Sequence, residues 1–484
     1  MSGFDSRPRY LLSEREMSSR SLRLRGFKDY LPQEMFLRRH IVETLQEVFE
    51  SYGFEPLATP ALERETVLLG YGEEASKQIY RFEDPDGVRV GLRYDLTVPL
   101  CRFVLSHPDL VLPFRRYQVQ SVWRYDKPDP GRFREFLQFD IDTVGAASVA
   151  ADGETIAAMA EALRRLKVPF RIRFSNRKIL NGLIRYAGIA TELAHSVFRV
   201  IDKLERIGLE RVLKQLGEGY VDDSGARIEG LQLEAAQIEK IEHFLSLGGG
   251  KREKVLSALA ELLNGIAEAE EGIEELREVS AVLSALDVEG EEAAVDPTIA
   301  RGLDYYTGVV YEAQVVGGER FGSVMGGGRY DGLIKALGGG DLPATGASVG
   351  VDRLAFVVET LGLWRRRRTV SDVLITVMVS DKLAEYMRLA DELRKAGLCV
   401  EVYMGGSRAI GKQLRYADKK GVRFAVIVGE DEWSQDVVSV KDLRAGEEAA
   451  ESIKEREEWL KKRAGQTTIS RKDLVAWLKQ RLQR

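Results

Sequence analysis

Hydrophobic side chains recur at helical spacing early in the chain and then change to shorter, strand-like runs. Between Met35 and Tyr52 the apolar positions fall on one side of a helix, and Gly53 ends the pattern. From Arg81 to Val104 the apolar runs are shorter, and the turn sequence at residues 84–87 separates the first two. We therefore predict a helix followed by short strands, the first two of which form a hairpin.

A second hairpin follows, with longer arms. One arm covers residues 115–124 and the other covers residues 133–144, with the Pro/Gly-containing tip at residues 128–131. Beyond it, residues 150–166 have the alanine-rich pattern of a helix, and residues 170–174 have that of a strand.

Helix-forming residues dominate from about residue 178 to residue 296, with two acidic runs and a Gly-Gly-Gly break at residues 248–250. We interpret this stretch as a helical insertion; a solvated linker domain without chemistry fits the pattern equally well. Strands cut by glycine-rich turns return from residue 301 to residue 358, and a helix is predicted at residues 353–361.

The last part of the chain has the pattern of a separate α/β unit. The run Arg365–Arg366–Arg367–Arg368 marks its boundary; these side chains can touch phosphates, although a solvated linker is the interpretation we favour. Strands at residues 373–379, 400–403 and 424–428 alternate with helical patterns, which predicts a parallel sheet with right-handed crossovers.

Composition excludes several classes of protein. The net charge is -5, so any nucleic acid would have to meet a local basic face. The two cysteines and four histidines have neither disulfide nor metal-ligand spacing, which favours a reducing compartment and argues against a zinc site. We find no apolar run of about 20 residues that would span a membrane and no secretory signal, so we expect a cytoplasmic protein with a flexible leader at residues 1–22.

The second hairpin carries the first candidate site. Strand alternation places Gln138, Asp140 and Asp142 on one face, with Arg124 on the partner arm. An arginine opposite amides and carboxylates can clamp an acyl phosphate while the acids hold an ammonium group. Taken alone, a surface hairpin with ion pairs is the simpler interpretation.

Three further clusters are glycine-rich. Residues 301–308, Arg-Gly-Leu-Asp-Tyr-Tyr-Thr-Gly, can line a pocket for a polar ring, or Tyr305 and Tyr306 can divide between core and surface. Residues 326–332 allow close approach of a backbone to a ligand, or form a tight bend at a sheet edge. Residues 346–354 join a strand to a helix whose first turn carries Arg353, which suits a phosphate, or they form a plain junction.

Together these clusters resemble the three motifs of class II aminoacyl-tRNA synthetases. Pro60 matches motif 1, the arginine hairpin matches motif 2, and Gly350-Val351-Asp352-Arg353 matches motif 3. Residues 301–308 and 327–331 look like signatures of histidyl-tRNA synthetases, and the run at residues 93–97 is also similar. The acidic residues Asp95 and Asp142 resemble those of the eukaryotic branch of that family more than those of the common bacterial branch.

The resemblance implies a fold and a domain plan. The fold class would be α/β (α+β): an antiparallel-sheet class II catalytic domain at residues 23–177 and 297–364, interrupted by the helical insertion at residues 178–296. An α/β anticodon-binding domain would occupy residues 371–484. The family works as a homodimer through its motif 1 helix, although an ordinary core helix would show the same apolar stripe.

The resemblance also implies residue roles. Arg124 and Arg301 would be catalytic, holding the α-phosphate and the charge that develops on it, and with Arg353 they would bind ATP. L-histidine would contact Asp95, Leu96, Thr97, Gln138, Asp142, Tyr305 and Tyr306. Mg²⁺ would accompany ATP, no metal would be bound by the protein alone, and tRNA(His) would receive the histidine.

Other functions remain open at this stage. A catalytically inactive regulatory subunit of ATP phosphoribosyltransferase resembles the catalytic domain but lacks the anticodon domain and the run at residues 301–306. A synthetase for threonine or proline is disfavoured by the tyrosine pair, and a pure tRNA-binding module is disfavoured by the phosphate-binding arginines.

Overall fold

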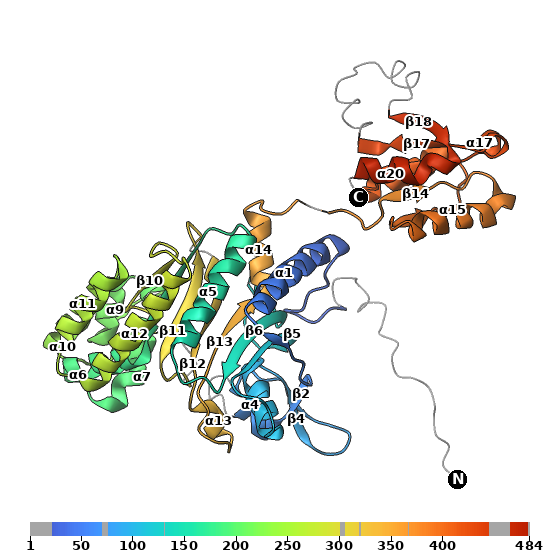
Figure 1. Cartoon of the computed structure of the whole chain (residues 1–484). Helices are drawn as coiled ribbons and strands as arrows, with labels where there is room; N and C mark the ends of the chain where they lie inside the picture. Colours follow the sequence, from blue (N-terminus) through green and yellow to red (C-terminus); the bar gives the residue numbers. More distant parts are fainter. Residues whose placement is uncertain are drawn as a thin grey trace, which may run out of the picture. The chain divides into compact units, whose positions relative to one another are not determined.

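The computed structural model describes residues 22–69, 76–129, 131–300, 305–318, 321–365, 367–444 and 465–482. The chain divides into two compact units (Figure 1). The first, which we call the catalytic unit, comprises Met1–Asp29 and Leu37–Trp364, and the second, the C-terminal unit, comprises Tyr30–Phe36 and Arg365–Arg484. Within the described residues, none of the helices has the length and apolar character required to cross a bilayer.

A mixed, mostly antiparallel sheet of eight strands organises the catalytic unit, in the order β1-β5-β6-β13-β12-β11-β7-β10. Its first and last pairs, β1 with β5 and β7 with β10, are parallel, and the pairs between them are antiparallel. The strands are β1 (Glu55–Pro56), β5 (Phe114–Trp123), β6 (Glu135–Val144), β7 (Phe170–Asn176), β10 (Ala293–Val295), β11 (Val309–Val315), β12 (Ser323–Arg329) and β13 (Ala344–Gly350). The predicted second hairpin is therefore confirmed as β5–β6.

Helices α1 (Pro32–Ser51), α5 (Ala150–Arg165) and α14 (Val351–Thr360) pack on this sheet (Figure 1). The apolar stripe predicted for α1 is buried, and the ring of Phe49 lies 5.2 Å from that of Phe139 on β6. All three helices share one hydrophobic core with the sheet. The predicted helices at residues 35–52, 150–166 and 353–361 are confirmed, with bounds that differ by a few residues.

The first hairpin forms as predicted, but the prediction of short strands up to Val104 is wrong. Strands β3 (Arg81–Glu83) and β4 (Arg89–Leu92) form with β2 (Leu62–Arg64) a sheet of order β2-β4-β3, next to the short helix α2 (Glu65–Leu68). Thr97–Ser106 is the helix α4. The Asp95 carboxylate accepts hydrogen bonds from the backbone N–H groups of Thr97 and Val98, and this satisfies two donors that a helix start leaves open.

The helical character predicted for residues 178–296 is confirmed. Helix α12 packs on both α5 and α6 and shares the core of the large sheet. Strand β10, at the end of this stretch, pairs with β7 of the large sheet. The elements are α6 (Arg177–Ala187), α7 (Ala194–Ile201), α8 (Leu204–Ile207), α9 (Leu209–Leu216), β8 (Gly219–Val221), β9 (Arg227–Glu229), α10 (Ala235–Ser246), α11 (Arg252–Leu262) and α12 (Ala267–Ala285).

The C-terminal unit contains a five-stranded sheet of order β15-β14-β16-β17-β18. The predicted parallel strands are confirmed as β14 (Val373–Ile375), β15 (Val400–Val402) and β16 (Phe424–Ile427). Two antiparallel strands that we did not predict extend the sheet: β17 (Val437–Asp442) and β18 (Gln466–Ser470). The α-helices in the described part of this unit are α15 (Leu383–Lys395), α16 (Ile410–Lys420), α17 (Glu430–Gln435) and α20 (Leu474–Leu482).

Candidate active site

A cavity of about 510 Å³ opens on the large sheet of the catalytic unit. Its walls come from the end of the β5–β6 hairpin, from β12 and β13, and from the first turn of α14. Arg124, Gln138 and Arg353, which the sequence places far apart, all line it. This volume lies within the range of about 300–1,000 Å³ that is typical of small-molecule binding sites.

Arg124 lines this cavity and forms no ion pair with a carboxylate of the described residues. It follows β5 directly, and its Nε donates to the Tyr94 carbonyl oxygen at 3.0 Å. Its Nη2 lies 3.5 Å from Gln138 Oε1, and the guanidinium stacks 4.3 Å from the centre of the Tyr94 ring. Because these partners are neutral, they hold the side chain without cancelling its charge, which leaves it able to bind an anion.

A buried carboxylate fixes the orientation of Gln138. The Gln138 amide nitrogen donates to both oxygens of Asp140, at 3.0 and 2.9 Å, so its oxygen points toward Arg124. Asp140 is 1 % exposed, and burial raises its pKa to about 6, against the opposing effect of Arg116. The predicted alternation along β6 is confirmed, since Gln138, Asp140 and Asp142 all lie on one buried face.

Asp142 lies deeper, against Arg116, whose side chain is fully buried. The two residues face each other across the β5–β6 ladder, with Nη2 of Arg116 2.7 Å from Oδ2 of Asp142. The Tyr330 hydroxyl donates to the other Asp142 oxygen. Burial raises the pKa of Asp142 to about 7, although Arg116 acts to lower it.

We did not single out Arg116 from the sequence, although a signal was present. Once the hairpin tip is fixed, counting back along the two arms places Arg116 opposite Asp142. Arg116 also donates to the Leu96 carbonyl oxygen at 3.2 Å, so it joins the start of α4 to the base of β6. The predicted residues Asp95, Leu96, Thr97 and Asp142 thereby belong to one connected region.

The predicted tyrosines Tyr305 and Tyr306 lie in the same region. Their ring centres are 5.0 Å apart, and the Tyr305 ring is 6.0 Å from that of Tyr330. Burial, together with the negative charges of Asp95, Asp140 and Asp142, raises the pKa of both hydroxyls. Two neutral hydroxyls therefore stand among three carboxyl groups. Arg301, the other predicted catalytic residue, lies outside the described residues.

Arg353 is placed by the residue that precedes it. The carboxylate of Asp352 accepts a hydrogen bond from the Leu137 backbone N–H at 2.8 Å and pairs with Arg38 of α1 at 2.9 Å, which ties α1, β6 and α14 together. The Arg353 guanidinium donates to the Ser323 carbonyl oxygen at 2.7 Å and lines the cavity. The predicted strand–helix junction with Arg353 in the first turn is confirmed as β13 followed by α14.

The glycines of strand β12 mainly allow close packing within the sheet, and contact with a ligand is secondary. Our alternative of a bend at a sheet edge is wrong, because β12 lies between β11 and β13. A Cβ at Gly327 would lie 2.0 Å from the Gly346 carbonyl oxygen, and a Cβ at Gly346 would lie 2.0 Å from Asp142 Oδ1. These two glycines therefore make room for the sheet and for Asp142, and of the three at residues 326–328 only Gly326 lines the cavity.

Arg329, in the same cluster, has a structural partner. Its guanidinium pairs with Asp152 of α5, and side-chain exposure is only 4% for Arg329 and 0% for Asp152. We expect Asp152→Ala to lower the free energy of unfolding of the catalytic unit by about 3–5 kcal/mol, since a buried guanidinium would lose its counter-charge. Urea unfolding measures this; Asp331→Ala, which removes a more exposed partner of Arg329, is the control with a smaller expected loss. Equal losses would contradict the assignment.

The arrangement of the sheet and cavity is that of a class II aminoacyl-tRNA synthetase catalytic domain: a mostly antiparallel sheet that carries an arginine hairpin and a strand–helix arginine on one cleft. Comparison with known protein families identifies the family within this class. A family described as "Histidyl-tRNA synthetase" matches residues 26–354, and an "Anticodon binding domain" family matches residues 372–463. The chain belongs to the histidyl-tRNA synthetase family.

Similarity to individual proteins supports the same family assignment. A histidine–tRNA ligase of Paracoccus denitrificans is 40% identical over 474 residues, which cover 93% of this chain and 95% of the relative. The crystal structure of histidyl-tRNA synthetase from Nostoc sp. PCC 7120 matches with a TM-score of 0.78 and 32% identity, over 95% of this chain and 99% of that one. A Bacillus halodurans structure described as an ATP phosphoribosyltransferase regulatory subunit/histidyl-tRNA synthetase matches at 24% identity and a TM-score of 0.66, over 81% of this chain and 95% of that one, which shows a shared fold alone.

Proposed function

We propose that the protein activates L-histidine with ATP and transfers the histidine to the 3′ end of tRNA(His). The observation that carries this proposal is the convergence of Arg124, Gln138 and Arg353 on one cavity, beside a buried group of carboxylates and tyrosines. Full-length similarity to histidine–tRNA ligases supports the same activity. The tRNA substrate implies a cytoplasmic location.

In the first step an oxygen of the histidine carboxylate attacks the α-phosphorus of ATP. A new P–O bond forms to the carboxylate, the bond to the β-phosphate oxygen breaks, and pyrophosphate leaves. Since the substrate is its own nucleophile, the protein contributes position and charge: alignment of two substrates can supply about 7–11 kcal/mol at the limit. Arg124 stabilises the charge at the α-phosphate, and Arg353 binds the far phosphate of ATP. By its resemblance, Arg301 assists Arg124.

The amino-acid side of the site is acidic and buried. Asp142, Asp95 and the oxygen of Gln138 receive the histidine ammonium group, with Leu96 and Thr97 beside it. Tyr305 and Tyr306 contact the imidazole. A pocket of buried polar groups rejects a substrate that cannot pair with them, so discrimination needs no separate editing step.

Mg²⁺ would accompany ATP. The carboxylates of Asp126 and Asp202 line the cavity at the ATP side, and oxygen donors of this kind fit an ion that keeps most of its water and phosphate ligands. When bound, the ion would neutralise charge on the phosphates.

In the second step a ribose hydroxyl of the terminal adenosine attacks the histidyl carbonyl carbon, and AMP leaves. The C-terminal unit, which matches the anticodon-binding family, would bind the other end of the tRNA. We also propose the four-part division of the chain given above.

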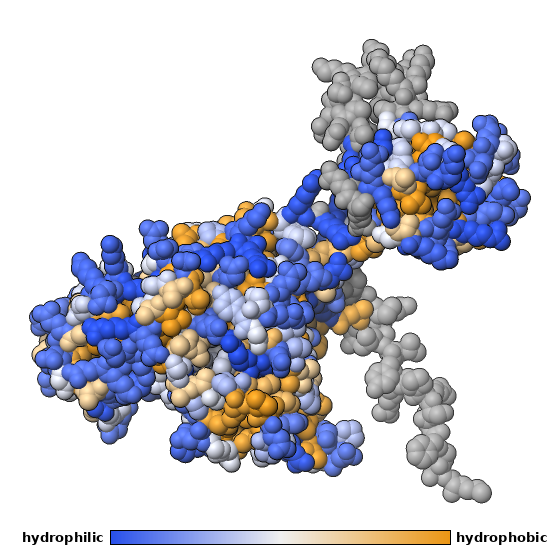
Figure 2. Space-filling model, in the orientation of Figure 1, coloured by the Kyte–Doolittle hydropathy of each residue, from blue (hydrophilic) through white to orange (hydrophobic). Residues whose placement is uncertain are grey.

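We propose a homodimer as the working form. Ile41, Leu45 and Phe49 of the α1 stripe are buried in the core of the catalytic unit, so this part of the stripe fits the ordinary core helix that the sequence also allows. Apolar side chains are exposed elsewhere, among them Leu62 of β2, Phe82 of β3 and Leu105 of α4. Figure 2 shows hydrophobic side chains gathered over the lower part of this unit, where Figure 1 places β2, α4 and α13 (Leu333–Ala336), and such a patch suits a protein partner.

The test is ATP–pyrophosphate exchange against all twenty amino acids, followed by charging of tRNA(His). We expect exchange with histidine alone, because the site pairs an acidic ammonium pocket with two tyrosines. Exchange with another amino acid would reassign the substrate. Absence of exchange with every amino acid, together with activation of an ATP phosphoribosyltransferase catalytic subunit, would support the regulatory alternative.

A further inference from the structure

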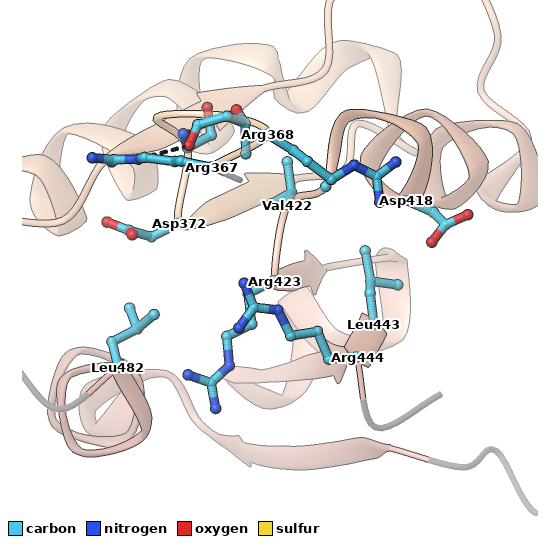
Figure 3. A pocket seen from close by; sticks show the side chains of 12 residues that line it. Arg367, Arg368, Asp372, Asp418, Val422, Arg423, Leu443, Arg444 and Leu482 are labelled. Carbon is cyan, nitrogen blue, oxygen red and sulfur yellow. Dashed lines mark hydrogen bonds between the residues drawn. The ribbon is translucent and has the colours of Figure 1, made fainter. Parts of the chain in front are cut away.

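A second cavity, of about 280 Å³, lies wholly within the C-terminal unit. Arg367 and Arg368 lie on one side of it, and Arg423 and Arg444 lie on the other (Figure 3). They come from three segments: the stretch before β14, the residue before β16, and the residues after β17. We propose that this cavity binds the sugar–phosphate backbone of RNA. The proposal rests on the tRNA substrate of the proposed function.

Neutral groups hold two of the four guanidiniums in place. Arg367 Nε donates to the Thr369 carbonyl oxygen at 3.0 Å, and Arg368 Nη2 donates to the Lys419 carbonyl oxygen at 3.0 Å. The second bond uses an open carbonyl at the end of α16, where the helix dipole favours a cation. Neither side chain is paired with a carboxylate in the described part of the chain, so both keep their full charge.

The other two arginines are also weakly compensated. Arg423 pairs with Asp442 at the long distance of 3.8 Å between Nε and Oδ2. The guanidinium of Arg444 has no ion pair within the described residues, and its backbone N–H bonds to Asp442. Buried arginines elsewhere differ: Arg116 and Asp142 lie 2.7 Å apart, and Arg38 and Asp352 lie 2.9 Å apart. In those pairs the charge is already cancelled.

Charge counting favours a phosphodiester, which carries one negative charge, over a doubly charged phosphate. Four arginines and two aspartates, Asp372 and Asp418, line the cavity, and the carboxylate of Asp442 lies beside Arg423, which leaves a net charge of plus one. One phosphodiester would balance this charge. Guanidinium groups bind phosphate oxygens in pairs, and the repulsion among four like charges is relieved when anions bind between them.

The position of the cavity separates it from the usual ligand crevice of an α/β sheet. Asp372 and Arg423 immediately precede the parallel strands β14 and β16, so the cavity lies at the amino ends of these strands. Open α/β sheets usually bind their ligands at the carboxyl ends. Backbone phosphates position an RNA without reporting its sequence. The cavity therefore supplies affinity that does not depend on the anticodon.

The experiment uses the full-length protein and the double variant Arg367→Gln/Arg444→Gln. The affinity for a tRNA(His) transcript is measured by fluorescence anisotropy over a series of KCl concentrations. We expect about tenfold weaker binding at low salt, and a slope of log K against log salt that falls by about 0.7–0.9 for each phosphate that the variant no longer neutralises. A tRNA with another anticodon should lose affinity by the same factor.

The matched control is Arg388→Gln, an exposed arginine of α15 in the same unit. It should leave the affinity and the slope unchanged. The site assignment is wrong if the double variant keeps the parental slope, or if Arg388→Gln alone weakens binding to the same extent. It is also wrong if inorganic phosphate or AMP displaces the tRNA as effectively as an RNA oligonucleotide does. Histidine-dependent pyrophosphate exchange needs no tRNA, so its rate should be the same in all variants. If the parent protein shows no exchange, the proposed function is overturned, but the tRNA-binding result still stands.

Discussion

Replacement of Arg124 by alanine is expected to slow histidine-dependent ATP–pyrophosphate exchange by about 10²–10³-fold, because it removes one preorganised donor from the position where negative charge develops. Within the described residues its guanidinium hydrogen-bonds to a carbonyl and an amide oxygen and forms no ion pair, so its charge is available to the α-phosphate. The loss should fall mainly on kcat, since the interaction strengthens in the transition state.

Two further variants make this result interpretable. Arg124→Lys keeps the charge but not the paired donors, so it should recover only part of the rate. Arg185→Ala, which removes an exposed arginine of α6, should leave exchange unchanged. The melting temperature of Arg124→Ala should stay close to that of the parent, because the hydrogen bonds removed contribute only about 1 kcal/mol. A normal exchange rate in Arg124→Ala would show that this arginine does not act on the reacting phosphate.

The elements predicted well from sequence are those whose signals are local and repeated. The stripe of α1, the alanine-rich α5 and the β5–β6 hairpin each have several apolar positions in one register and a defined turn or end. Helix α4 was mistaken for strand because its start depends on one side chain, Asp95, and because its apolar run is short. Strand β18 pairs with β17 across a long stretch of chain, for example Ser470 with Val437, and a local pattern does not report such a partner.

The residues of the candidate site also differ in how well local sequence signals predict their positions. Arg124, Gln138 and Asp142 belong to one hairpin, so alternation and a turn were enough to place them near one another. Arg353 could be associated with them only through the family resemblance, since the closeness of α14 to the hairpin is a product of the sheet order. The ion pair of Arg116 with Asp142 depends on register, which becomes readable only when the hairpin tip is known to the residue.

This ion pair gives Asp142 two different tasks that a single substitution cannot separate. The carboxylate compensates the buried charge of Arg116, and it is proposed to receive the histidine ammonium group. We expect Asp142→Asn to lower the free energy of unfolding by about 3–5 kcal/mol, because Arg116 would remain buried without a counter-charge. The same variant should raise the KM for histidine.

The double variant Arg116→Gln/Asp142→Asn separates the two tasks. Without the buried cation, much of the stability should return, because a neutral pair can exchange hydrogen bonds in the same space. The KM for histidine in pyrophosphate exchange should nevertheless stay raised by about 10–100-fold, since a charged hydrogen bond is worth about 1.5–3 kcal/mol and about 1.4 kcal/mol corresponds to a factor of ten. Urea unfolding and exchange kinetics on the same preparations measure both quantities. If the KM for histidine returns to the parental value together with the stability, then Asp142 serves only to balance Arg116, and the ammonium group must be held by Asp95 and Gln138.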